Sequence, residues 1–295
     1  MERLRKEGWD SVRPALATIV RFRNILRVKT VTYLFICRYW VVNGFLVGKA
    51  ESNYTSAMEY HRNALSIINW GRQVWKDVPK DKRGIIFEIT FRRGVWNMYL
   101  DSLMGAHSHD RKNFQLLERI FEEADALIRD VDDHPFNPQE YPPDSDPGFV
   151  LSFFHNIKGN AFACKGLYHS YMGEYGKDRS IGTVQDHWMS AMQSYTDAAD
   201  CIPDDDKNHP WYLNCAYNFM EVARVPTSTV MAVLARIRLS VPKMRQVWCQ
   251  NPSTILRDRE ETYAKLLKVE ERAKSLIARK VITLRGPFDW DAVEK

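Results

Sequence analysis

The sequence predicts an all-α protein built from antiparallel helix hairpins that stack into a superhelix of about ten to eleven helices. The first observation is the stretch Trp188–Pro203, in which Ala191, Tyr195 and Ala198 fall on one helix face before a closing proline. Small side chains let another helix approach closely, and the tyrosine fills the gap between them. The second observation is the same small–large–small spacing earlier in the chain, at Ala57, His61 and Ala64.

The N-terminal third of the sequence predicts three helices. Residues 10–29 are basic, with Pro14 in the first turn, where a helix accepts proline well. Residues 30–48 are apolar, and residues 51–70 carry the first small–large–small pattern. We expect Gly71 to weaken or bend this third helix, because glycine has a low helix propensity.

The apolar run at residues 31–48 is about as long as a bilayer is thick. It contains Arg38 and Asn43, which are costly in lipid, and two glycines. We therefore expect a buried helix and no membrane span. The N-terminus lacks an apolar core followed by small residues, so no signal peptide is expected either.

Two helices are predicted in the middle of the chain, at residues 83–106 and 113–131. The second is strongly amphipathic. The segment 134–148 carries five prolines and cannot continue a helix. It predicts a boundary between an N-terminal half, residues 1–133, and a C-terminal half, residues 149–295, within one continuous superhelix.

The C-terminal half predicts two further hairpins and a capping helix. The residues between Gly159 and Ala191 are too many for a simple hairpin, so we expect residues 173–185 to be an inserted loop. A third hairpin begins at Trp211 and returns over residues 226–240. The remaining elements are a charged helix at 257–280, which caps the stack, and a tail at 281–295 that either folds back or is loose.

These patterns resemble the tetratricopeptide repeat (TPR). The residues that match its second helix are Ala191, Tyr195, Ala198 and Pro203; those that match its first helix are Trp40 and Gly44. The thirty-four-residue period of the family is absent, so the resemblance is to a divergent TPR-like protein. The segments Trp75–Pro79, Ile86–Gly94 and Arg236–Lys243 are also similar to basidiomycete fungal TPR-like proteins of unassigned role. The resemblance implies a right-handed superhelix with a concave binding face.

The resemblance also implies which positions face a ligand, namely those around the glycine of each first helix. In this chain they are Arg38, Val41 and Phe45; Phe153, Asn156, Asn160 and Cys164; and His209, Tyr212, Ala216 and Phe219. Asn160 lies where TPR domains that hold a C-terminal carboxylate place an asparagine, and Arg38 could supply a cation. The lysine expected four residues earlier is Asn156, so that clamp is incomplete. Alternatively, Asn160 bonds to the backbone of a neighbouring helix.

Charge and cysteine usage limit the classes of partner. The formal net charge is +5 and the isoelectric point about 8.8, which is too weakly basic to predict a nucleic acid partner. Residues 1–30 hold eight basic residues and residues 118–148 hold ten acidic ones, which suit pairing or ordinary solvated helix faces. Five scattered cysteines without a CxxC pair indicate a reduced, cytoplasmic protein.

The common catalytic motifs are absent, and we expect neither a cofactor nor a metal. The sequence contains no GxxxxGK[ST], GxGxxG, HExxH, GxSxG or ExxH. His107 and His109 suit a capping loop better than a metal site, and residues 204–206 suit a solvated turn. Cys164 is most simply interpreted as a buried thiol.

Two functional hypotheses remain open. The first is an interaction scaffold that binds a peptide or a helix of a protein partner in a concave groove. The second is an all-α enzyme or small-molecule binder with an enclosed aromatic pocket. Its polar groups would come from Glu88, Arg92, His155 or Asn160. Glu88 and Arg92 are spaced for an ordinary ion pair on one helix, which is the simpler interpretation.

Overall fold

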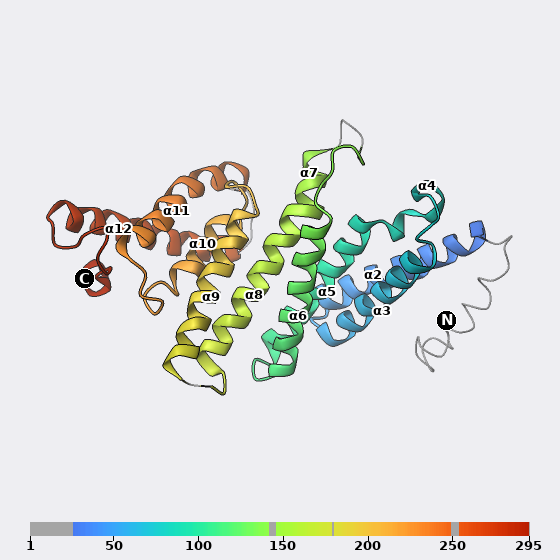
Figure 1. The fold of residues 1–295 in the computed structure, drawn as a ribbon, viewed down its shortest axis with the longest axis horizontal. Coiled ribbons are helices and arrows are strands. Elements are labelled where there is room, and N and C mark those ends of the chain that lie inside the picture. The colour runs from blue at the N-terminus through green and yellow to red at the C-terminus, as the bar shows by residue number, and fades with distance from the viewer. Residues whose placement is uncertain (1–25, 142–145, 179, 249–253, 295) are drawn as a thin grey trace. The chain divides into compact units, whose positions relative to one another are not determined.

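The backbone is mainly helical in the part of the chain that the computed structural model describes, residues 26–141, 146–178, 180–248 and 254–294. Within these residues there is no β-strand, only an isolated bridge between Pro226 and Pro287. The chain divides into two compact units, Met1–Leu116 and Leu117–Lys295, which we describe separately. The expected all-α class is confirmed (Figure 1). The basic helix expected at residues 10–29 lies almost wholly outside the described residues.

The first unit is built on a helix hairpin joined by a short turn. Its elements are α2 (Leu26–Ala50), α3 (Tyr54–Val74), α4 (Lys80–Arg83), the 3-10 turn η1 (Ile85–Phe87) and α5 (Ile89–His109). Gly44 of α2 lies against His61 of α3, and Gly48 lies against Ala57, so the two helices run antiparallel. The turn ends at Asn53, whose side chain accepts a hydrogen bond from the Ser56 amide at 3.1 Å and caps α3.

α5 packs antiparallel to α3 on another face. Tyr54 covers Gly105 at one end, and Arg92 donates to Asn69 at the other end at 2.7 Å. The helix expected at residues 83–106 begins only at Ile89, because Gly84 has a left-handed φ of 98° and a 3-10 turn follows it.

Gly71 continues α3 and does not break it. The ring of Phe87, from η1, lies so close that a Cβ atom on Gly71 would be 2.1 Å from it. This glycine is therefore required for a close contact, whereas the sequence suggested a weak point. Phe87 in turn packs against Trp75, with ring centroids 4.9 Å apart.

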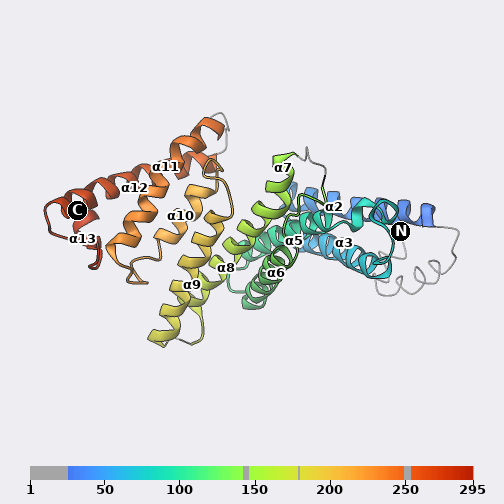
Figure 2. The same cartoon turned by 45° about the horizontal axis from the view of Figure 1, so that its top comes forward.

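The second unit contains the Trp188–Pro203 stretch. Its helices are α6 (Phe114–Asp133, all but its first turn), α7 (Pro147–Val150), the π-helical turn η2 (Leu151–His155), α8 (Asn156–Tyr175), α9 (Ile181–Asp200), α10 (His209–Tyr217), α11 (Thr227–Trp248), α12 (Thr254–Ala278) and α13 (Trp290–Glu294). In both views α10 lies between α9 and α11 (Figures 1 and 2). The predicted small–large–small face is correct, since Ala191 and Ala198 are fully buried.

α8 is covered on two faces by antiparallel neighbours. On one face Lys165 pairs with Asp125 of α6 at 2.7 Å, and Lys158 pairs with Asp132 at 2.5 Å. On the other face three glycines, seven residues apart, each lie beneath a group of α9; the pairs are Gly159 with Ala198, Gly166 with Tyr195 and Gly173 with Trp188.

The prediction of an inserted loop at residues 173–185 is wrong. α8 continues to Tyr175 and α9 begins at Ile181, which leaves a turn of five residues. Asp178 closes this turn by accepting hydrogen bonds from the Ser180 amide and the Thr183 hydroxyl, both at 2.9 Å. The extra residues therefore lengthen both helices.

The proline-rich segment is a connection between α6 and α7 inside the second unit. The two compact units divide one helix earlier, between Leu116 and Leu117. Within the segment, Phe136 and Tyr141 stack at 5.3 Å, and both rings contact Phe154 of η2. The segment thus packs against the start of the long α7–η2–α8 helical run.

The C-terminal tail folds back on the second unit. The Thr227 amide at the start of α11 donates to the Gly286 carbonyl at 2.9 Å, and the Thr227 hydroxyl donates to the Pro287 carbonyl at 3.0 Å. Phe288 is buried, and Trp290 packs against Tyr217 of α10 with ring centroids 5.4 Å apart. Of the two alternatives that the sequence left open, the folded-back tail is confirmed.

Candidate functional site

The most prominent surface feature in the first unit is a row of large apolar side chains on α2. Their exposed fractions are Phe35 65%, Tyr39 46%, Val42 53%, Phe45 47% and Leu46 51%. We call these five residues the α2 face. Side chains spaced by three and four residues share one side of a helix, so the α2 face is a continuous stripe along about three turns. Contiguous exposed apolar surface of this kind marks interaction sites.

The α2 face exists because most of the side chains of α2 are apolar, while only one side of the helix is covered. Its opposite side is buried against α3 and carries Tyr33, Cys37, Trp40, Gly44 and Gly48. A helix without a polar face normally lies in a core. The sequence predicted a buried helix for this run, and the structure buries only one of its two faces.

Two basic side chains border the α2 face. Arg38 and Lys49 are both exposed and lie eleven residues apart, which is three helical turns. They therefore project from the same edge of the stripe, with Phe45 between them. No acidic residue occurs from Leu26 to Ala50. Of the residues expected to face a ligand in the first unit, Arg38 and Phe45 do lie together on an exposed surface, while Val41 is half-buried.

Glu88 and Arg92 do not share a helix as the sequence suggested. Glu88 precedes α5 as its N-cap residue and forms an ion pair with Arg83 at 3.2 Å. The Arg92 guanidinium lies 4.5 Å from the centre of the Trp96 ring and donates to Asn69. Both side chains thus take part in contacts inside the first unit.

The predicted residues of the second unit lie at the start of α8. His155 ends the π-helical turn and is exposed, Asn156 begins α8, and Asn160 is half-buried one turn later. The Asn156 Oδ1 atom is buried without a hydrogen-bond partner among the described residues. Since π-helical turns often occur at functional sites, this end of α8 remains a candidate ligand-binding site.

The register of the repeat differs from the expected one. The glycine beneath the large residue of the pattern is Gly166, because a Cβ atom built at this position would lie 2.8 Å from the Tyr195 ring. In the first unit Gly44 has the same relation to His61. Gly159 lies seven residues earlier, against the Ala198 carbonyl. Asn160 therefore does not follow the structurally equivalent glycine, and the proposed carboxylate clamp loses its geometric basis.

Tyr212 of α10 has a packing role. It is half-buried and lies against the hydrophobic core of the second unit, together with Phe219 and Tyr195. Next to it, Arg259 of α12 lies 4.4 Å from the centre of the Trp211 ring and donates to Asn208 at 3.2 Å. This contact fastens α12 to the start of α10.

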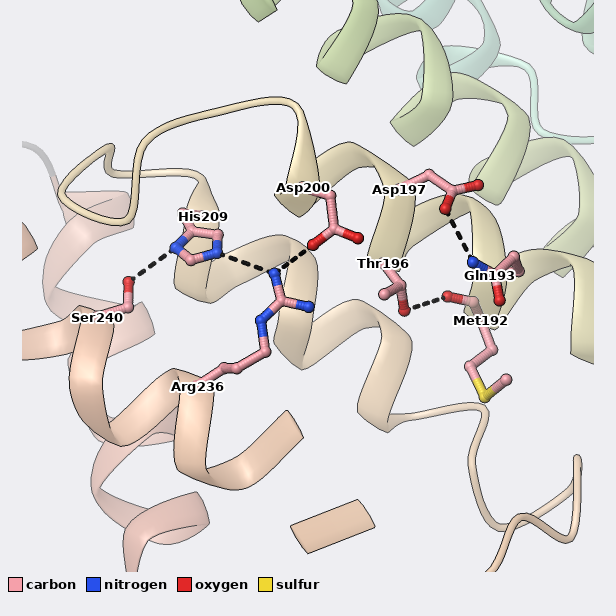
Figure 3. A network of polar contacts seen from close by, with 8 residues as sticks. All are labelled: Met192, Gln193, Thr196, Asp197, Asp200, His209, Arg236 and Ser240. Atoms are coloured by element: carbon pink, nitrogen blue, oxygen red, sulfur yellow. Dashed lines mark hydrogen bonds and ion pairs between the residues drawn. The ribbon is translucent and has the colours of Figure 1, made fainter. Parts of the chain in front are cut away.

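A polar network joins α9, α10 and α11 (Figure 3). Arg236 donates to Asp200 at 2.5 Å and lies 3.4 Å from His209 Nε2, while His209 Nδ1 lies 3.2 Å from the Ser240 hydroxyl oxygen. The Ser240 hydroxyl donates to the Asp204 carbonyl at 2.6 Å. Its oxygen must then accept from His209 Nδ1–H, which leaves Nε2 to accept from Arg236.

This network is structural, although it contains a serine, a histidine and an aspartate. The proton of Ser240 is held by a backbone carbonyl, and Ser240 itself is 1% exposed. Burial lowers the pKa of His209, and the positive charge of Arg236 lowers it further, so the ring is kept neutral. The turn at residues 204–206 is held against α11 by a further ion pair, between Lys243 and Asp204.

The other residues considered for chemistry are buried or involved in local contacts. Cys164 is 1% exposed, and burial raises the pKa of Cys37 and Cys215 to about 12. These thiols are poor nucleophiles. Among the described residues, no group of three or more His, Cys, Asp or Glu side chains could hold a metal ion. His109 contacts the Gly105 carbonyl at 3.0 Å at the end of α5, as a helix-capping residue does.

A cleft of about 520 Å³ lies in the second unit, where the sequence indicated only a loop. It is formed by the start of α9 and the turn after α10, and its lining includes Ile181, Val184, Trp188, Val222 and Arg224. It is open and shallow compared with an enclosed ligand pocket. A separate finding is that no described helix is both long and apolar enough to cross a bilayer.

Comparisons with known proteins add no assignment. No family model matches the sequence, and neither a curated protein nor a solved structure gives a significant match. The α2 face must therefore be interpreted from its own geometry and from the charges at its edge.

Proposed function

We propose that this protein is an interaction scaffold and that the α2 face binds a helix of a protein partner. The observation that supports this most directly is the exposure of five large apolar side chains on one side of a single helix. An amphipathic helix laid along such a stripe inserts its own side chains at the same three- and four-residue spacing. A divergent TPR-like fold is consistent with this role, since helical repeats serve mainly as binding surfaces.

The expected affinity follows from the area that is still exposed. Covering the exposed half of a large apolar side chain contributes about 1 kcal/mol. Five such side chains therefore contribute about 5 kcal/mol. The loss of translational and rotational freedom on association opposes this gain, and the partner's own buried side chains offset part of that cost. We therefore expect a dissociation constant on the order of 100 µM or weaker. A scaffold that uses this face alone would bind weakly and reversibly.

The alternative, an enzyme or small-molecule binder with an enclosed aromatic pocket, has less support. The residues suggested for its polar groups lie in two separately described units, with Glu88 and Arg92 in the first and His155 and Asn160 in the second. Glu88 and Arg92 are held by local contacts. A small-molecule ligand therefore stays a secondary hypothesis.

The test is binding of a designed helical peptide with leucines on one face and an uncharged polar face, measured by NMR titration of the full chain. We expect saturable shifts with a dissociation constant on the order of 100 µM or weaker. Val42→Asp should weaken binding at least tenfold, because it places a charge in the middle of the stripe. Leu239→Asp is the matched control, since Leu239 on α11 is also exposed, at 57%. Equal binding by both variants would contradict the proposal.

A further inference from the structure

The edge of the α2 face carries charge of one sign. Arg38 and Lys49 flank it, and neither forms an ion pair with another described residue. The nearest acidic residue in the sequence after α2 is Glu51, which lies past the end of the helix. The surface thus combines apolar contact area with two unneutralised positive charges.

We infer that the partner helix is acidic, with two carboxylates on one edge of its apolar stripe. This inference rests on the proposed function of the α2 face. Arg38 and Lys49 are three turns apart, which is about 16 Å along the helix axis. Two carboxylates separated by the same three turns, at positions i and i+11, would meet both cations at once. The Arg38 guanidinium can hold its carboxylate through two parallel hydrogen bonds, whereas Lys49 acts as a point charge.

A second copy of the chain fits this edge poorly. If two α2 faces paired about a two-fold axis, the basic edges would have no acid to meet, because α2 contains none. Like charges across an interface oppose association. The N-terminal residues 1–25 of the same chain are also a poor match, since they contain six basic and three acidic residues.

An anionic membrane surface would also attract the two cations, but α2 carries little charge for a helix that lies on a membrane. Helices that lie on membranes carry many lysines and arginines along their polar face. Among the described side chains of α2, residues 33–50, only Arg38 and Lys49 are charged, and the opposite side of the helix is occupied by α3. The limited, spaced charge suits two specific ion pairs better than a continuous layer of lipid headgroups.

The test compares three designed helical peptides that share one leucine stripe and carry Glu, Gln or Lys at positions i and i+11. Binding to the full-length chain is measured by NMR titration in 0.1 M salt. The Glu peptide should bind about tenfold more tightly than the Lys peptide, with the Gln peptide between them. In 1 M salt, where the screening length falls from about 10 Å to about 3 Å, the three affinities should converge.

The double variant Arg38→Glu/Lys49→Glu should reverse the order and prefer the Lys peptide. Equal affinities for the three peptides would overturn the inference but leave the scaffold proposal intact. If none of the peptides bound, the proposed function of the α2 face would be contradicted, and this inference with it. The variant Lys265→Glu is a matched control, because it reverses an exposed charge on α12 and should leave the order unchanged.

Two further measurements separate the competing occupants. A photo-crosslinking phenylalanine analogue at Tyr39 should capture the Glu peptide, and capture of residues 1–25 or of a second copy would overturn the inference. Vesicles containing phosphatidylserine provide the membrane comparison. If Val42→Asp abolished binding to these vesicles while the Glu peptide did not compete, a lipid surface would replace the acidic helix as the occupant.

Discussion

The hairpin α2–α3 of the first unit and the hairpin α8–α9 of the second pack through the same kind of contact. They differ in how much of the first helix is covered by other helices. In each, a glycine on the first helix lies beneath a ring on the second: Gly44 beneath His61, and Gly166 beneath Tyr195. α8 is also covered by α6, through the ion pairs Lys165–Asp125 and Lys158–Asp132. α2 has no described helix on its outer face. The contact between a glycine and a ring therefore packs each hairpin, while the neighbouring helices decide which surface of it stays exposed.

The ring at the shared position also differs in chemistry. Burial lowers the pKa of His61 to about 4, partly offset by the nearby Val41 carbonyl, while Tyr195 stays uncharged at ordinary pH because burial raises its pKa. At this position the first hairpin therefore carries a group that becomes charged in acid, and the second carries one that stays neutral there.

The largest expected effect is acid sensitivity of the first unit through His61. Its pKa is about 4 in the folded state and 6.5 in the unfolded chain. The stability it contributes is fully present above pH 6.5 and is lost as the pH falls towards 4, by up to about 3 kcal/mol. Replacing the ring with the aromatic type of the other hairpin, His61→Phe, should remove this part of the pH dependence and leave the part due to His169, whose pKa burial also lowers to about 4. An unchanged pH profile of the variant would refute this role of His61.

The next largest effect tests the close glycine contact in the second hairpin. Gly166→Val should destabilise the protein by about 2 kcal/mol, because the new side chain would overlap the Tyr195 ring. Gly182→Val is the matched control, since a Cβ at Gly182 meets no atom within 4 Å. The measurement is chemical denaturation of both variants. If both lost the same stability, backbone propensity and not the Tyr195 contact would explain the glycine.

A smaller effect is expected in the polar network that joins α9, α10 and α11. Ser240→Ala removes the acceptor for His209 Nδ1–H and should cost about 1–2 kcal/mol, because that donor is then buried without a partner. Arg236→Gln removes the exposed pair with Asp200 and should cost less than about 1 kcal/mol. The reverse ranking in urea denaturation would show that the ion pair, and not the histidine, fixes this contact.

The smallest effect concerns the uncovered face. Val42→Asp should change the unfolding free energy by less than about 0.5 kcal/mol, as expected for a solvent-exposed position. The same substitution at Val230, which is fully buried in the second unit, should cost several times more. A loss above about 2 kcal/mol at Val42 would mean that another part of the chain covers the α2 face and would remove the contrast between the two hairpins.

Much of the fold could be predicted from local patterns. Ala191 and Ala198 are buried as their spacing indicates, and the amphipathic pattern of residues 113–131 corresponds closely to α6. The errors concern long-range packing. Nothing local to residues 173–185 reveals that Gly173 lies beneath Trp188, and this contact extends both helices through the expected loop. Likewise, Gly71 looks like a helix breaker until Phe87, sixteen residues later, is placed against it.

The candidate site was predictable only in part. Arg38 and Phe45 follow from a resemblance to helical repeats, and both are exposed. The exposure of Val42 and Leu46 could not be predicted, since an all-apolar helix normally indicates burial on every side. The available signal was the absence of acidic residues from Leu26 to Ala50 together with four basic residues, Arg27, Lys29, Arg38 and Lys49, a pattern that favours an acidic partner.

The most direct test of the central proposal is hydrogen exchange of the full-length chain with and without the Glu peptide. Slower exchange should be confined to the amides of residues 35–49 on α2, because a bound helix limits opening of the element that it contacts. Protection at the cleft around Ile181 and Val222, or no protection on α2 at a saturating peptide concentration, would contradict the assignment of α2 as the docking surface.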